Sequence, residues 1–158
     1  MKPLAALCLG SLPQLCLAWP APTSIGRRLS LFVSPASADK QPLDDASKWT
    51  LKKVSREIPA DNRVWLGFHI TSPGCEPQWC YMLVHVPDHA HEASFSNQPC
   101  VGSNFTASWG YRADEDAGIL TLFNPHKSRT AWFGWNHVNN STDLADVGPN
   151  ATSETGKK

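Results

Sequence analysis

The chain contains 158 residues with 14 basic and 14 acidic side chains, so its formal net charge is zero. This length predicts one domain, and neutrality excludes nucleic-acid binding through a clustered basic face and attachment to an acidic membrane surface. Charged residues make up 18% of the chain, below the roughly 25% of an ordinary soluble domain. We therefore expect a binding partner to contact aromatic and polar side chains rather than charged ones.

Residues 1–18 have the layout of a secretory signal peptide. A single positive charge precedes an uncharged apolar stretch, and the segment ends in the small residue Ala18. The stretch is too short, and too interrupted by Gly10 and Pro13, to span a bilayer as a helix. A buried N-terminal helix is the alternative. We therefore expect a secreted, extracellular protein without a membrane anchor.

Residues 19–48 are rich in proline and small polar residues. This composition predicts a flexible arm or pro-segment. The dibasic pair Arg27 and Arg28 in this segment is either a second processing site or two solvated arginines.

Three cysteines remain beyond the signal peptide: Cys75, Cys80 and Cys100. In an oxidising compartment they most simply form one disulfide and leave one thiol. We expect the bond between Cys80 and Cys100, because each lies beside a strand-like run and the bond would join two distant segments. Cys75 then keeps a free thiol, which could form an intermolecular disulfide and so a homodimer. The alternative is that this thiol is buried and unreactive.

Residues 49–138 carry the strand signals and form the predicted β domain. Apolar residues recur at every second position, and turn-forming residues separate the runs. This pattern predicts an all-β fold, a small antiparallel β-barrel or sandwich with one disulfide. The expected strands cover residues 49–54, 64–70, 81–86, 105–109, 119–123 and 130–135.

Trp132 and Trp135 are the candidate binding residues. Neighbouring side chains of a strand point to opposite faces, so at least one aromatic residue of the run 132–135 is expected on the outer face. Exposed aromatic rings on a sheet hold sugar rings or partner proteins. The alternative is a small barrel that uses its tryptophans to fill the interior.

His89 and His91 are weak candidates for metal ligands, because on a strand they would face the same way. A working site needs three or four ligands, and no third lies nearby, so an exposed polar loop is the alternative. No G-x-S-x-G nucleophile elbow occurs, and the acidic run 114–116 is typical of a hairpin turn rather than a glycosidase pair. We therefore expect no catalytic residues, no cofactor and no metal.

Four N-glycosylation sequons lie in the last third of the chain, at Asn104, Asn139, Asn140 and Asn150. The sequons at Asn139 and Asn140 overlap, so we do not expect both to carry a glycan. Residues 139–158 are polar and rich in turn formers, which predicts a disordered, glycosylation-prone tail.

The order of cysteines and strands over residues 49–138 resembles small secreted ascomycete proteins of the Alternaria major allergen-like group. The resemblance implies a compact antiparallel β-barrel with disulfides and an effector role toward a plant host, and it carries over no catalytic residues. The chain departs from the group in having only three cysteines beyond the signal peptide, which leaves the disulfide set of the family incomplete. The matching features are Cys75 and Cys80 with the strand at 81–84, residues 93–95 leading to Cys100, and the segments 104–110, 119–123 and 131–135.

We therefore predict a non-enzymatic secreted fungal protein, effector-like, that binds a host protein or a small ligand through a sheet face. A carbohydrate-binding or cell-wall protein that holds a glycan with exposed tryptophans is one alternative. A secreted hydrolase or metalloprotein is another.

Overall fold

The structure, a computed structural model, describes residues 40–156. The expected signal peptide at 1–18, most of the expected arm at 19–48 and the pair Arg27 and Arg28 lie outside the described residues. Within the described part, no helix is long and apolar enough to cross a membrane.

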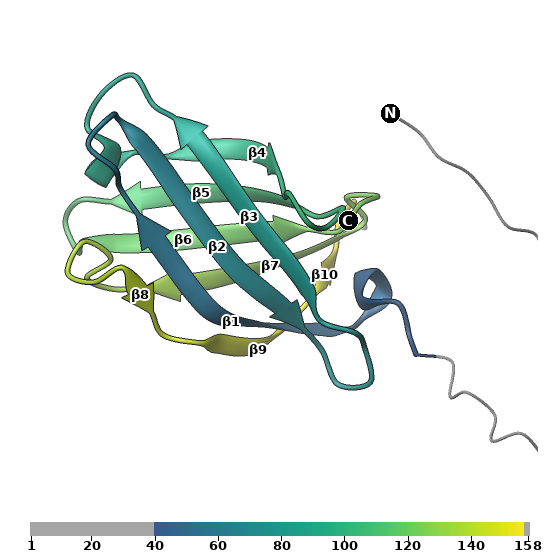
Figure 1. Ribbon diagram of the computed structural model, residues 1–158. Coiled ribbons are helices and arrows are strands. Elements are labelled where there is room, and N and C mark those ends of the chain that lie inside the picture. Colours follow the sequence, from purple (N-terminus) through teal and green to yellow (C-terminus); the bar gives the residue numbers. More distant parts are fainter. Residues whose placement is uncertain (1–39, 157–158) are drawn as a thin grey trace, which may run out of the picture. The chain divides into compact units, whose positions relative to one another are not determined.

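Two antiparallel sheets account for most of the described chain (Figure 1). The first sheet has the strand order β3-β2-β1-β8, with β9 also paired to β1, and the second has the order β10-β7-β6-β5-β4. Figure 1 shows the strands of the first sheet running obliquely across those of the second. The first sheet contains β1 (Lys48–Glu57), β2 (Arg63–Thr71), β3 (Gln78–His85), β8 (Asp143–Leu144) and β9 (Val147–Ala151). The second contains β4 (Phe95–Pro99), β5 (Thr106–Arg112), β6 (Ala117–Phe123), β7 (Arg129–Trp135) and β10 (Ser153–Glu154), and two short 3-10 helices are η1 (Leu43–Asp45) and η2 (Ala90–Glu92).

Period-two alternation builds the core between the two sheets. Trp49 of β1 meets Phe105, which precedes β5, with ring centroids 5.1 Å apart and nearly perpendicular planes. The predicted all-β fold is confirmed as a sandwich of two sheets, and the closed barrel that the family resemblance implies is not formed. The alternate apolar residues of β2 and of the β3 region are buried as predicted: Val64, Leu66, Phe68, Ile70, Met82, Val84 and Val86.

A bulge in β1 changes the face that its residues use. Leu51 is buried before the bulge and Arg56 is buried after it, although strict alternation would place them on opposite faces. The register of β1 on β2 shifts between Lys52 and Ser55, and Lys53 in that interval has a left-handed φ of 52°. One extra residue in the strand therefore turns the Arg56 side chain into the interior.

The predicted disulfide between Cys80 and Cys100 is confirmed. Cys80 lies in β3 of the first sheet, and Cys100 follows β4 of the second sheet. Next to the bond, the backbone amides of Tyr81 and Val101 each donate to the carbonyl of the other residue, at 3.1 and 2.8 Å. The covalent bond and this bridge together tie the two sheets at one edge.

The prediction of a disordered tail at 139–158 is wrong, because strands β8, β9 and β10 lie in this segment. These strands are short and mostly polar, so they carry no alternating signal. Backbone pairing holds them, and Leu144 and Val147 add apolar contacts to the core. The amide of Thr152 donates to the carbonyl of Ser47 at 2.9 Å. The end of the predicted arm also packs on the domain, since Leu43 is buried and its carbonyl accepts from Trp49 Nε1 at 2.9 Å.

Candidate functional site

A shallow groove of about 610 Å³ lies on the outer face of the second sheet. Trp132 of β7 is 51% exposed there, and Ile119 of β6 is 41% exposed. Trp132 pairs in register with Thr121, which pairs with Ser108, so the groove has an aromatic residue at one side and hydroxyls across it. Its lining residues are Ser94, Phe95, Ser96, Ser108, Trp109, Gly110, Ile119, Thr121 and Trp132.

Two glycines flank Ile119 on the neighbouring strands, and one of them, Gly110, lines the groove. Gly110 and Gly134 are the cross-strand partners of Ile119 on β5 and β7. A Cβ atom added at Gly110 would have no heavy atom within 4 Å, and one at Gly134 would meet only the Gly118 carbonyl oxygen at 3.9 Å. The missing side chains therefore leave space over the sheet surface rather than relieving a contact within the fold.

Trp135, the other predicted binding residue, does not share this surface. It is 8% exposed, stacks on Trp109 with ring centroids 6.1 Å apart, and donates from Nε1 to the carbonyl of Ala145 at 2.7 Å. Residues 132 and 135 are an odd number apart, so a strand places them on opposite faces. The prediction that one aromatic residue of this run faces outward is confirmed for Trp132, and Trp135 is corrected to a core residue.

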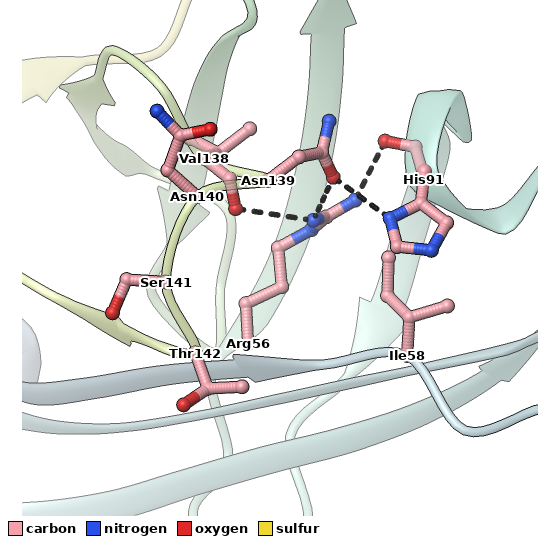
Figure 2. Close-up of a pocket in the computed structure, with 8 residues that line it drawn as sticks. All are labelled: Arg56, Ile58, His91, Val138, Asn139, Asn140, Ser141 and Thr142. Carbon is pink, nitrogen blue, oxygen red and sulfur yellow. Dashed lines mark hydrogen bonds between the residues drawn. The ribbon is translucent and has the colours of Figure 1, made fainter.

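A second concavity, of about 250 Å³, surrounds the buried side chain of Arg56 (Figure 2). The guanidinium donates from Nη1 to the carbonyl of Val138 at 3.4 Å and to Oδ1 of Asn139 at 2.9 Å. It donates from Nη2 to the carbonyls of Ala90 at 3.4 Å and His91 at 2.9 Å. Arg56 therefore clamps β1 to η2 and to the loop that follows β7.

The charge of Arg56 is balanced from inside the protein. Burial lowers the pKa of its guanidinium, and the neighbouring Asp116 and Tyr111 oppose that effect. The guanidinium carbon also lies 5.4 Å from the ring centroid of Trp109, within reach of a cation–π contact. Because four hydrogen bonds to the chain itself already engage both Nη atoms, the arrangement fits a structural clamp better than an anion-binding site.

Asn139 is the hub of this cluster. Its Nδ2 donates to Asp116 Oδ1 at 2.6 Å and to the Tyr111 hydroxyl at 3.4 Å, while its Oδ1 accepts from Arg56 and faces His91 Nδ1 at 3.2 Å. Partial desolvation raises the pKa of Asp116, but hydrogen bonds from Asn139 and Tyr111 outweigh it and hold this pKa below its ordinary value. Asp116 belongs to the predicted hairpin turn between β5 and β6, which is confirmed.

His89 and His91 lie around η2 rather than on a strand, so they do not present a shared strand face. His89 has a left-handed φ of 48°, and its Nε2 is 3.1 Å from Asp88 Oδ2. His91 contacts Asn139 instead. Across the described residues, no group of three or more histidine, cysteine or acidic side chains is placed to hold a metal ion.

The remaining predicted positions differ in accessibility. Asn104 and Asn140 are exposed, whereas Asn150 is half-buried and its Nδ2 donates to the carbonyl of Trp132 at 2.5 Å. Cys75 is half-buried and is the free cysteine of the described part of the chain. Its intermolecular pairing stays a prediction.

Sequence reasoning missed an aromatic cluster on the outer face of the first sheet. Trp65 of β2 and Trp79 of β3 lie over Gly67, because a Cβ atom there would be 2.7 and 3.1 Å from their ring atoms. His69 packs against Trp79 with ring centroids 4.6 Å apart. Trp79 precedes the buried Cys80, so period-two alternation extended by one residue would have found it.

The family model described as Effector TSP1 matches residues 50–157. The match covers well over half of the chain, most of β1 and every strand from β2 to β10. The curated proteins compared with the chain give no match.

Proposed function

Because the chain belongs to the Effector TSP1 family, we propose that it is a secreted, non-enzymatic effector that binds a host protein through the groove around Trp132. The observation that carries this proposal is the exposure of Trp132 and Ile119, at 51% and 41%, beside the open floor at Gly110. The finer resemblance to the Alternaria major allergen-like group stays a prediction within this proposal.

The chemistry of the groove favours binding to a protein surface. The exposed apolar side chains of Trp132 and Ile119 share the groove with serine and threonine hydroxyls, the combination of apolar and polar groups that protein interfaces use. No charged or histidine side chain occurs among its lining residues in the described chain. A serine hydroxyl without a neighbouring base is a poor nucleophile, which favours recognition over catalysis.

A capture experiment tests the proposal. The secreted protein, Trp132→Ala, Gly110→Val and the control Leu83→Ala are immobilised and exposed to host tissue extract. Leu83 is a matched control, since it is 50% exposed on the other sheet. We expect Trp132→Ala to weaken capture of one defined protein at least about tenfold, the usual effect of removing a central tryptophan.

Gly110→Val adds a side chain to the groove at a position where a Cβ atom has no heavy atom within 4 Å, and it is expected to act like Trp132→Ala. Unchanged capture by both variants, with loss only in Leu83→Ala, would assign binding to the first sheet and contradict the proposal.

The aromatic cluster over Gly67 favours a second candidate, a glycan-binding function. Aromatic rings that lie over a sheet surface, like those of Trp65 and Trp79 over Gly67, suit stacking on sugar faces. Titration with cell-wall polysaccharides, followed by tryptophan fluorescence of the protein and of Trp79→Ala, tests it. A shift that disappears in Trp79→Ala supports this function, and no shift with any polysaccharide contradicts it.

A further inference from the structure

We infer that the protein carries an N-linked glycan on Asn140 and not on Asn139. The two residues begin overlapping sequons, Asn139-Asn140-Ser141 and Asn140-Ser141-Thr142, so the sequence alone leaves the acceptor undecided. The inference rests on the proposed secretion, because N-glycosylation takes place in the secretory pathway. Hydrogen bonding in the folded chain distinguishes the two side chains.

Both amide hydrogens of the Asn139 side chain already form hydrogen bonds. A primary amide carries two N–H donors, and those of Asn139 are directed to Asp116 Oδ1 at 2.6 Å and to the Tyr111 hydroxyl at 3.4 Å. A glycan replaces one of these hydrogens and places a bulky sugar between the amide and its partners. The same side chain orients its Oδ1 toward the buried guanidinium of Arg56 at 2.9 Å, so the clamp would lose its geometry as well.

Asn140 is free of these constraints. Both asparagines are exposed, but the side chain of Asn140 makes no hydrogen bond with any residue in the described range. Its backbone amide, which donates to the carbonyl of His137 at 3.1 Å, holds the turn in place. Figure 2 shows the Asn140 amide apart from the hydrogen-bonded group around Arg56. A sugar attached there extends into solvent at the rim of the Arg56 concavity.

The glycan would be transferred to Asn140 from an oligosaccharide carried on a lipid pyrophosphate. Nδ2 of Asn140 forms a bond to the anomeric carbon of the sugar, the bond from that carbon to the pyrophosphate oxygen breaks, and one amide proton is lost. No oxidant or reductant is required. A chain that receives the sugar on Asn139 instead must fold with at least one of the two hydrogen bonds of its Nδ2 lost, which selects against it.

The glycan would leave the groove around Trp132 open. Asn140 follows the end of β7, whereas Asn104 precedes the start of β5. Strands β5 and β7 are both antiparallel to β6 and run in the same direction, so the two sequons lie at opposite ends of the second sheet. Sugars at these positions would flank its outer face without covering it.

Glycopeptide mapping tests the inference. The full chain is expressed in secreting eukaryotic cells, and the secreted protein is deglycosylated enzymatically in water enriched in heavy oxygen, which marks each former acceptor for mass spectrometry. We expect the mark on Asn140 in at least about tenfold excess over Asn139, a ratio that corresponds to ~1.4 kcal/mol. Asn104→Gln serves as a control that removes a separate glycan.

Two variants keep one sequon each and separate the alternatives. Asn139→Gln is expected to retain the glycan on Asn140 but to melt at a lower temperature, whereas Asn140→Gln is expected to lose the glycan without its moving to Asn139. A glycan on Asn139 in secreted protein of wild-type melting temperature would overturn the inference, as would a bare Asn140 in protein glycosylated at Asn104. Protein retained in the cell without any glycan would instead contradict the proposed secretion, and this inference with it.

Discussion

Replacing Gly118 with alanine is expected to destabilise the protein strongly, although the change adds only one methyl group. Gly118 lies in β6, and a Cβ atom there would sit 2.1 Å from two ring atoms of Trp109. That ring has little freedom to move, because it is 2% exposed, stacks on Trp135 and lies beneath Arg56.

The magnitude follows from overpacking of a closed core. Forcing an extra methyl group into such a site costs about 1–3 kcal/mol, occasionally more, and the short contact to a buried tryptophan at Gly118 places this variant near the upper end, at about 3 kcal/mol. For a domain of this size, that loss lowers Tm by roughly 10 to 20 °C.

Thermal and urea unfolding of Gly118→Ala and Gly110→Ala measure the effect. Gly110 lies on the neighbouring strand β5 but has no heavy atom within 4 Å of an added Cβ, so its variant is expected to be neutral or slightly more stable. Equal stability of the two variants, or a loss below about 0.5 kcal/mol in Gly118→Ala, would refute the packing derived for Trp109.

Three further predictions concern the clamp, the disulfide and acid. Arg56→Met removes the guanidinium donor from the carbonyls of Val138, Ala90 and His91 and is expected to cost about 3 kcal/mol or more in urea unfolding. A loss below about 1 kcal/mol would contradict the clamp. Replacing both Cys80 and Cys100 with alanine is expected to cost about 3 kcal/mol, whereas Cys75→Ala is expected to change the free energy of unfolding by no more than about 0.5 kcal/mol; equal losses would contradict the pairing. The pKa of Asp116 in the folded protein lies below its ordinary value of 3.8, so its contribution to the free energy of unfolding is present above that pH and is lost as the pH falls through the folded pKa. Asp116→Asn is expected to reduce this loss of stability in acid. An unchanged dependence of the free energy of unfolding on pH would show that Asp116 does not contribute.

The parts of the fold that follow from local pattern were predictable. Buried residues at every second position define β2 and β3, and the positions of Cys80 and Cys100 beside strand-like runs indicate their bond. Trp132 was found because neighbouring residues of a strand face opposite ways. The same rule, applied to Trp135, would have placed it in the core.

Features set by long-range pairing were not predictable. The clamp at Arg56 depends on the bulge at Lys53, which shifts alternation by one residue and has no signal in the sequence. Strands β8 to β10 are held mainly by backbone pairing to β1 and β7, with only Leu144 and Val147 packed against the core, so their composition is typical of a disordered tail. The role of Asn139 arises from contacts with residues 23 and 83 positions away.

Side-chain footprinting of the protein alone and in complex with its captured partner tests directly whether the groove around Trp132 is the binding surface. Oxidative labelling followed by mass spectrometry reports the exposure of Trp132 and Leu83, which are similarly exposed on opposite sheets at 51% and 50%. The partner is expected to protect Trp132 several-fold and to leave Leu83 unchanged. Protection of Leu83 or Trp79 with no change at Trp132 would contradict it.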